Sequence, residues 1–274
     1  MRMSSQRLDA AIVSRGIASG REKAKELIAG GGIKVNGRRV TKPSLAVMPE
    51  DEITVEAGFA QRYVGRGGYK LEKALQLGAS PDGKICLDVG ASTGGFTDCM
   101  LQYGAKKVYA LDVGHGQLHE SLRSRSDVVN MEGLDIRNIE KICKIIPPAS
   151  VQFCSVDVSF ISIRKIINCL PHYLEEGAEA VLLIKPQFEA GRAAVGKRGV
   201  VRDPAAHRAV LRDILDVLQG CRFTVDILTF SPIAGGDGNI EYLALTRYTV
   251  SERAGFDVDA VVAEAFRIHG RSMV

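Results

Sequence analysis

The fold is decided by the stretch ICLDVGASTGGF, residues 85–96. Its first half is a short apolar strand that ends at Asp88, and its second half is a glycine-rich turn that opens a helix. Gly90, Gly94 and Gly95 free the backbone to approach a ligand at the carboxyl end of the strand, near the N-terminus of the next helix. The stretch therefore predicts a parallel α/β sheet with a ligand site at this strand end.

The glycine spacing restricts the class of ligand. A dinucleotide fingerprint has glycine at its first, third and sixth positions, whereas here Ser92 occupies the third position and Gly95 the sixth. The second glycine lets a pyrophosphate approach, so its absence argues against NAD. Asp112 ends the next predicted strand, where a carboxylate would accept hydrogen bonds from ribose hydroxyls. A nucleoside-bearing cofactor without a pyrophosphate, S-adenosylmethionine, fits both observations, and a Rossmann dehydrogenase is the alternative.

Seven apolar, β-rich runs alternate with helical patterns from residue 85 onward. The early runs are almost continuously apolar, which is typical of a parallel sheet buried on both faces. The stretch SPIAGGDGNI between the last two is too short for a helical crossover, so these two should be antiparallel neighbours. We expect a doubly wound, seven-stranded Rossmann-like α/β sheet that ends in an antiparallel pair. The predicted strands are ICLDVG (85–90), KVYALDV (107–113), DVVNME (127–132), VQFCSVDVSF (151–160), EAVLLIKP (179–186), FTVDILTF (223–230) and EYLALTRY (241–248).

Three charged residues interrupt the later strands. Asp157 and Lys185 come at the ends of their strands, and Glu241 opens its own strand. Because that last strand runs antiparallel, its start lies at the same edge of the sheet as the ends of the others. An unpaired buried charge is costly, so the three side chains are candidates for an active site, with a buried structural ion pair as the alternative.

The N-terminal segment differs in charge from the rest of the chain. Residues 1–45 contain ten basic and three acidic residues, a net charge of +7; because the whole chain carries +4, residues 46–274 carry −3. A basic segment on a mildly acidic body predicts a nucleic-acid contact, and a solvated basic face is the alternative.

The same segment has the pattern of a small α+β module. Two short helices are predicted within RLDAAIVS and REKAKELIA, followed by the hairpin IKVNGRRV with an Asn36-Gly37 turn. Over residues 6–55 this pattern resembles the RNA-binding module named after ribosomal protein S4. The resemblance implies phosphate contacts that give salt-dependent affinity with little sequence readout. The basic side chains assigned to these contacts are Arg7, Arg21, Lys34, Arg38 and Arg39.

The larger part of the chain resembles the TlyA family of FtsJ-like RNA 2′-O-ribose methyltransferases, once labelled hemolysin A. The similar motifs are RGGYKL, DVGASTGGFT, DVGHGQL, VDVSFIS, IKPQFE, GVVRDP and GNIEYL. Lys70, Asp157, Lys185 and Glu241 match the Lys-Asp-Lys-Glu tetrad of FtsJ-like enzymes. The resemblance implies methyl transfer from S-adenosylmethionine to the 2′-hydroxyl of cytidine in ribosomal RNA.

The resemblance also assigns roles to individual residues. Lys185 would be the base, Asp157 would orient it, and Lys70 and Glu241 would hold the ribose and the lysine. A base must be neutral, and a second ammonium nearby would favour loss of the proton. The cofactor would contact Asp88, Gly90, Ser92, Gly94, Gly95, Phe96, Asp112 and Asp135. Asp112 would bind the ribose and Asp135 the adenine amino group; for Asp135 a helix N-cap is the alternative.

Three segments follow from these assignments: an S4-like RNA-binding domain at 1–58, a linker at 59–66 and a methyltransferase domain at 67–274. The linker region FAQRYVG is too apolar for a freely flexible tether, so we expect it to be partly ordered. Arg66 at its end is expected to contact the RNA backbone.

Other classes are disfavoured. The six cysteines contain no C-x-x-C pair, so we expect reduced thiols and no metal site. No apolar run approaches the roughly 20 residues of a membrane helix, and no secretory signal is recognisable, so a cytoplasmic protein is expected. The expected partners are ribosomal RNA and ribosomal subunits, with no membrane; the oligomeric state is open, with a monomer favoured. The alternatives are a non-catalytic RNA-binding ribosome-assembly factor and, from the family's old label, a membrane-active hemolysin.

Overall fold

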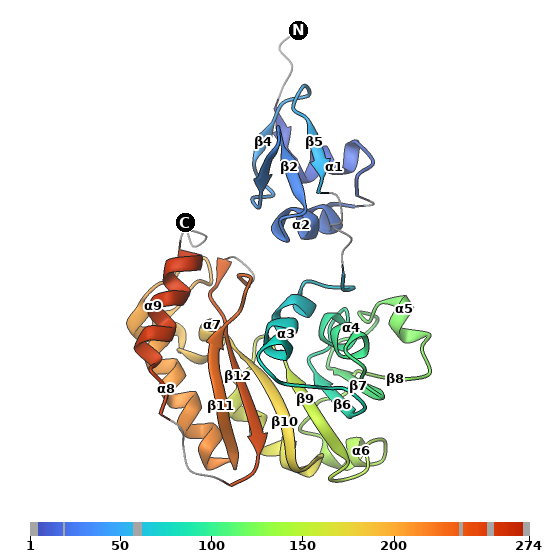
Figure 1. Ribbon diagram of the computed structural model, residues 1–274, viewed down its shortest axis with the longest axis vertical. Helices are drawn as coiled ribbons and strands as arrows, with labels where there is room; N and C mark the ends of the chain where they lie inside the picture. Colours follow the sequence, from blue (N-terminus) through green and yellow to red (C-terminus); the bar gives the residue numbers. More distant parts are fainter. Residues whose placement is uncertain (1–4, 19, 57–61, 236–237, 251–254, 271–274) are drawn as a thin grey trace. The chain divides into compact units, whose positions relative to one another are not determined.

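The computed structural model describes residues 5–18, 20–56, 62–235, 238–250 and 255–270 of the 274-residue chain. The chain forms two compact units, residues 1–66 and 67–274 (Figure 1). Residues 59–61 of the predicted linker lie outside the described residues, so the bounds of the linker stay a prediction. Within the described ranges, no helix has the length and apolar character needed to cross a membrane.

The N-terminal unit is a small α+β module. Its helices are α1 (Leu8–Ser14) and α2 (Arg21–Ala29). A three-stranded antiparallel sheet has the order β3 (Arg38–Val40), β2 (Ile33–Val35), β5 (Ile53–Val55), and β1 (Gln6–Arg7) pairs with β4 (Ala46–Val47). Asn36 and Gly37 both have positive φ, 50° and 75°, as a two-residue hairpin turn of this twist requires. The predicted module, including its hairpin, is therefore confirmed.

The C-terminal unit is built on one seven-stranded sheet. The strand order is β11-β12-β10-β9-β6-β7-β8. The five strands from β10 to β8 are parallel, and β12 is antiparallel to both of its neighbours. The doubly wound sheet with a terminal antiparallel pair is thus confirmed. The strands are β6 (Ile85–Val89), β7 (Lys107–Asp112), β8 (Val128–Glu132), β9 (Val151–Val156), β10 (Leu174–Ile184), β11 (Phe223–Phe230) and β12 (Tyr242–Tyr248).

Helices cover the sheet. α3 packs against α4, α4 packs against β6 and β7, and α8 packs against both β11 and α9. Figure 1 shows α8 and α9 beside β11, and α3 and α4 beside each other near the middle of the sheet. The helices are α3 (Gly67–Gln76), α4 (Gly95–Gln102), α5 (Glu120–Arg123), α6 (Ile139–Cys143), α7 (Pro186–Glu189), α8 (Pro204–Gly220) and α9 (Val258–His269), with 3-10 turns η1 (Ile163–Lys165), η2 (Ile167–His172) and η3 (Arg192–Ala194).

The core explains why the strands are so apolar. The central strands β6, β9 and β10 are buried along most of their length, so side chains on both of their faces are apolar. All six cysteines are free thiols, and Cys86, Cys99 and Cys154 are buried. The buried polar side chains of these three strands are Asp88 of β6 and Ser155 of β9, both near the carboxyl ends of their strands.

Candidate active site

The candidate site lies where the order of the sheet reverses. β6 and β9 are neighbours, and the chain continues from β6 to β7 on one side and from β9 to β10 on the other. Open α/β sheets bind ligands in the crevice at such a point, outside the carboxyl ends of the strands. Gly90 follows β6 with φ +88°, and a Cβ added to it would lie 2.4 Å from the carbonyl oxygen of Asp157. The two strand ends can approach this closely only because residue 90 is a glycine.

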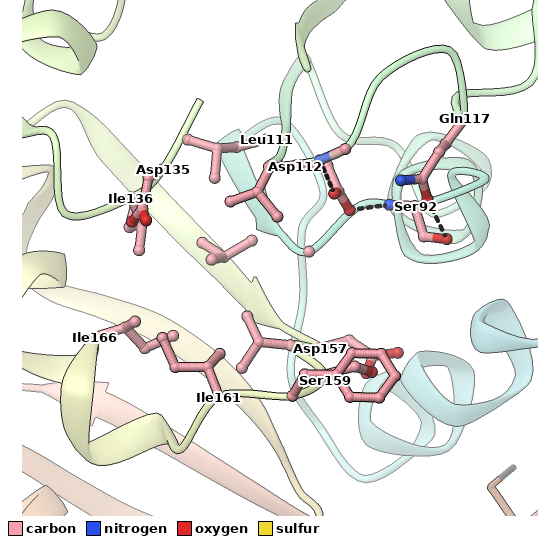
Figure 2. Close-up of a pocket in the computed structure, with 16 residues that line it drawn as sticks. Ser92, Leu111, Asp112, Gln117, Asp135, Ile136, Asp157, Ser159, Ile161 and Ile166 are labelled. Atoms are coloured by element: carbon pink, nitrogen blue, oxygen red, sulfur yellow. Dashed lines mark hydrogen bonds between the residues drawn. The ribbon is translucent and has the colours of Figure 1, made fainter. Parts of the chain in front are cut away.

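A cavity of about 370 Å³ opens at this crevice, a size within the range of small-molecule sites (Figure 2). Much of its wall is aliphatic, including Leu111 and Ile166. The charged residues of its lining are Asp112, Asp135 and Asp157, and the lining includes no basic residue. This charge favours a ligand that carries positive charge and disfavours a pyrophosphate.

Asp112 fixes the loops at one side of the cavity. Its Oδ2 accepts a hydrogen bond from the Ser92 amide at 2.8 Å, and its Oδ1 accepts one from the Gly114 amide at 2.7 Å (Figure 2). The Ser92 hydroxyl donates to Gln117 Oε1 at 3.2 Å. Because a carboxylate offers about four lone-pair directions, Asp112 retains capacity for the ribose hydroxyls predicted from the sequence.

Asp135 lines the same cavity and is bound by Arg137. The Arg137 Nε lies 2.9 Å from Oδ1, and the Arg137 guanidinium also donates to Oδ2. This side-chain hydrogen bond holds the pKa of Asp135 below its ordinary value. The alternative role of Asp135 as a helix N-cap is wrong, because α6 begins at Ile139 and Asn138 caps it.

Four residues of the predicted cofactor set do not line the cavity. Gly94 is the N-cap of α4 and Gly95 its first residue, and the buried ring of Phe96 lies against Gly67. Asp88 is fully buried, where its carboxylate accepts hydrogen bonds from two hydroxyls, Thr97 Oγ1 at 2.6 Å and Ser155 Oγ at 2.9 Å. These contacts join β6, α4 and β9 to one another.

Burial of Asp88 predicts a distinctive pH dependence of stability. Burial raises the pKa of its carboxyl from about 4 to about 7, although the two hydroxyl hydrogen bonds oppose the shift. A carboxyl with a raised folded-state pKa stabilises the fold fully below its unfolded pKa, and this contribution is lost as pH rises through about 7. The loss between pH 4 and 7 is on the order of 4 kcal/mol.

The variant Asp88→Asn stays neutral across this range, so its free energy of unfolding should lack that loss. Urea denaturation at pH 4, 5.5 and 7 measures the difference between the variant and the parent protein. Glu120→Gln, which alters an exposed carboxylate, is the matched control. Parallel pH profiles of Asp88→Asn and the parent would contradict the assignment.

The four charged residues of the predicted tetrad form two ion pairs. Lys70 Nζ donates to Glu241 Oε2 at 2.6 Å. Lys185 Nζ lies 2.5 Å from Asp157 Oδ1 and donates to Ser159 Oγ at 2.9 Å. The exposed fraction of each of the four side chains is 17% or less. Buried charges require such pairing, and because Asp157 lines the cavity, the Lys185–Asp157 pair borders that cavity.

Strand register and helix spacing bring the two ion pairs together. Ile184 of β10 is paired with Tyr242 of β12, so the register continues with Lys185 opposite Glu241. Gly67 and Lys70 are three residues apart on one face of α3. A Cβ added to Gly67 would lie 3.9 Å from Asp157 Oδ2, while Lys70 reaches Glu241. Both pairs therefore border the first turn of α3.

The pairing differs in one respect from the sequence expectation. The sequence predicts that the ammonium of Lys70 favours loss of the proton from Lys185. In the structure each lysine has its own carboxylate, so the four groups sum to zero formal charge. Repulsion between the two lysines is therefore largely offset and does not by itself account for a neutral base.

Two residues beside the tetrad were not identified from the sequence. Ser159 accepts the hydrogen bond from Lys185, and Phe160 follows it. Phe160 is 92% exposed with φ +65°, and its ring centroid lies 5.2 Å from that of Phe188. A left-handed φ is costly for a bulky residue and is characteristic of functional sites. The motif VDVSFIS contains both residues, but the exposure and the backbone conformation of Phe160 become known only from the structure.

In the N-terminal unit, Arg7 and Arg21 share one carboxylate. Asp9 is fully buried, and Arg7 donates two hydrogen bonds of 3.0 Å to it while Arg21 lies at 3.3 Å. The Arg7 side chain holds the pKa of Asp9 below its ordinary value. These two predicted RNA contacts therefore also stabilise the unit.

The remaining predicted RNA contacts differ from one another. Lys34 and Arg39 pair with Glu56 at 3.1 and 2.6 Å. Arg66 is partly buried. Arg38 is exposed on β3 and pairs with no carboxylate among the described residues. Arg38 is thus the contact whose loss should affect RNA binding without a structural cost.

Arg38→Ala should weaken RNA binding and leave the melting temperature unchanged. Loss of one phosphate contact makes the slope of log affinity against log salt less negative by about 0.7–0.9. Arg7→Ala is the matched comparison and should lower the melting temperature of the unit, because Asp9 then loses a partner. Titrations of ribosomal RNA at several salt concentrations, together with thermal melts, test both expectations; an unchanged slope for Arg38→Ala would exclude it as a phosphate contact.

No group of three or more His, Cys, Asp or Glu side chains able to hold a metal ion occurs in the part of the chain that the structure describes.

The chain matches two known families along its length. Residues 63–248 match the FtsJ-like methyltransferase family, and residues 6–53 match the S4 domain. The FtsJ-like match includes β6 to β12 and the whole tetrad.

Curated relatives and solved structures extend the likeness to nearly the whole chain. A Bacillus subtilis protein named "Putative rRNA methyltransferase YqxC" is 46% identical over 241 residues, 87% of this chain and 84% of that protein. The 16S/23S rRNA (cytidine-2'-O)-methyltransferase TlyA of Mycobacterium tuberculosis is 38% identical over 252 residues, 90% of this chain and 91% of that protein. A solved structure described as "Putative hemolysin from Streptococcus thermophilus" is 40% identical and superposes with a TM-score of 0.75 over 98% of each chain.

Proposed function

The chain belongs to the FtsJ-like methyltransferase family, and from that premise we propose that it transfers a methyl group from S-adenosylmethionine to the 2′-hydroxyl of a cytidine in ribosomal RNA. The observation that carries the proposal is the juxtaposition of two buried Lys–carboxylate pairs with an acidic, nucleoside-sized cavity at the switch point of the sheet. An intact tetrad argues against a non-catalytic RNA-binding factor.

The cavity fits S-adenosylmethionine better than a dinucleotide. Its lining has three carboxylates and no cation, which suits a ligand with a sulfonium and an ammonium. Asp112 would hold the ribose hydroxyls and Asp135 the adenine edge, between aliphatic walls that include Leu111 and Ile136. When bound, S-adenosylmethionine supplies a methyl group already activated by the positive charge on sulfur.

The chain's own residues handle the proton of the target hydroxyl. A ribose 2′-hydroxyl is a very weak acid, so it must lose its proton as its oxygen attacks. We assign this proton to Lys185 Nζ, which must first be neutral. Asp157 and Ser159 fix the direction of the Lys185 amine, at 2.5 and 2.9 Å. Much of the acceleration then comes from alignment of the reacting oxygen.

The second pair and the exposed aromatic residue position the substrate. Lys70, held by Glu241 at 2.6 Å, offers an ammonium that can donate to a ribose or phosphate oxygen. Phe160 presents an exposed ring beside Ser159, and a base taken out of its stack can pack on such a ring. Together these groups suit a splayed nucleotide better than a paired one.

The decisive experiment is to incubate the protein with radiolabelled S-adenosylmethionine and ribosomal subunits from a strain that lacks this methylation. The label should appear in RNA on the 2′-oxygen of a cytidine, which nuclease mapping and mass spectrometry of nucleosides identify. Label on a base would overturn the ribose assignment, and label in no RNA would overturn the proposed function.

A further inference from the structure

The motif GVVRDP belongs to a basic loop that the proposed reaction leaves unexplained. We define the basic loop as residues 192–202, which begin with η3 just after α7. It carries four exposed cations, Arg192, Lys197, Arg198 and Arg202, and no acidic residue; Asp203, which follows, caps α8.

The arginines of the basic loop differ from the other arginines of the C-terminal unit. Eight described arginines of residues 67–274 pair with a carboxylate, and Arg123 donates to the Leu118 carbonyl. Within the same described residues, only Arg192, Arg198 and Arg202 form neither kind of contact. Exposed cations grouped together without acidic partners provide an attractive surface for a polyanion.

The basic loop has a defined shape. The Gly199 amide donates to the Gly196 carbonyl at 2.9 Å and the Gly196 amide to the Val200 carbonyl at 3.0 Å. These bonds close a turn whose two central residues are Lys197 and Arg198. The cations at the tip therefore project from a closed turn.

Two buried side chains anchor the basic loop close to Glu241. Asn239 donates to the Gly199 carbonyl at 3.1 Å and accepts from the Val201 amide at 3.3 Å. His207 contacts the Val201 carbonyl at 2.9 Å and the Tyr242 hydroxyl at 2.8 Å. Glu241 lies between Asn239 and Tyr242 in the sequence, so the loop is held by residues on both sides of this predicted catalytic residue.

The first residue of the loop is close along the chain to Lys185. Arg192 follows Lys185 by seven residues, which span at most about 25 Å when extended, and four of them form the turn of α7. Arg192 therefore lies within a few nucleotides of any ribose that Lys185 could reach.

We propose that the basic loop is a second RNA-binding surface, which binds phosphates of the strand that carries the target nucleotide. The inference rests on the proposed function for the identity of the RNA, but the phosphate-binding chemistry is independent of catalysis. Its role is to hold the substrate strand at the catalytic unit, separately from the S4-type contacts of the N-terminal unit.

The test compares two triple variants of the full chain with the parent. Arg192→Ala/Lys197→Ala/Arg198→Ala removes three charges from the basic loop. Arg125→Ala/Lys144→Ala/Arg267→Ala removes three charges from exposed residues that each pair with a neighbouring carboxylate. Binding of isolated ribosomal subunits is measured at 50–300 mM salt by fluorescence, and methyl transfer is measured at varied subunit concentration.

The loop variant should make the slope of log affinity against log salt less negative by about 2–3. It should also raise the KM for subunits at least tenfold. Its kcat at saturating subunits and its affinity for S-adenosylmethionine should stay within twofold of the parent. The control variant should change the slope by less than 0.5.

The outcomes separate this inference from the proposed function. Equal slopes for the loop variant and the control would overturn the loop assignment, even if methylation of RNA is demonstrated. A reduced slope for the loop variant alone would support it, even if the parent protein labels no ribose. A fall in kcat with an unchanged slope would also overturn the assignment, because the loop would then act on the reaction rather than on RNA binding.

Discussion

Lys185→Met is expected to reduce the rate of methyl transfer at saturating RNA and cofactor by about 10²–10⁴-fold, the usual contribution of a positioned general base. Methionine keeps the apolar stem of the side chain and removes the amine. The loss should appear in kcat, because the amine acts on the proton that leaves during attack. Single-turnover transfer of labelled methyl to ribosomal subunits measures it.

Binding measurements distinguish lost chemistry from lost structure. Affinity for ribosomal subunits should stay within about threefold of the parent, since Lys185 is buried and the predicted phosphate contacts lie elsewhere. Lys165→Met, which alters an exposed lysine in η1, is the matched control and should leave the rate unchanged. A Lys185→Met rate within tenfold of the parent would remove Lys185 from the role of base.

Gly90→Ala should lower the free energy of unfolding of the protein and abolish binding of the cofactor. A Cβ at this position would stand 2.4 Å from the Asp157 carbonyl oxygen, and the backbone φ of +88° is itself unfavourable for alanine. Strain and overpacking each cost about 1–3 kcal/mol, so the free energy of unfolding should fall by roughly 2–5 kcal/mol. Urea denaturation measures the fall, and calorimetric titration with S-adenosylmethionine measures the affinity.

Gly177→Ala separates the two effects. Gly177 has nearly the same φ, +84°, but no heavy atom lies within 4 Å of an added Cβ. It should lose only the stability that a left-handed alanine costs, about 1 kcal/mol, and bind the cofactor normally. If Gly90→Ala and Gly177→Ala were equally stable, the close approach of β6 and β9 would not constrain residue 90.

The succession of strands along the chain, and the antiparallel direction of the last pair, were predictable from the pattern of apolar residues. Buried parallel strands read as continuous apolar runs, and the short segment before Glu241 excludes a crossover helix, which fixes β12 as antiparallel. That single inference also predicts that Glu241 faces the same edge as Asp157 and Lys185. The placement of these three charges is a consequence of the topology, so the sequence alone predicts it.

The details that depend on side-chain partners were not predictable. A sequence does not state which of several carboxylates an arginine will bind, so Arg7 and Arg21 gave no sign that they share Asp9. Asp88 and Asp112 each end a strand, yet one is fully buried and the other faces a cavity. Asp88 is enclosed by the hydroxyls of Thr97 and Ser155, whereas Asp112 accepts hydrogen bonds from loop amides beside the cavity.

The antiparallel strand β12 also determines where the chain can change length. Lys185 faces Glu241 because six successive residue pairs of β10 and β12, from Glu179–Arg247 to Ile184–Tyr242, lie in register. A deletion of one residue inside 241–248 would turn each later side chain to the opposite face or withdraw Glu241 from Lys70. Insertions between Tyr248 and Val258, where α9 begins, leave this register untouched. Evolutionary gains and losses of residues should therefore be tolerated between Tyr248 and the start of α9 at Val258, and eliminated by selection between Glu241 and Tyr248.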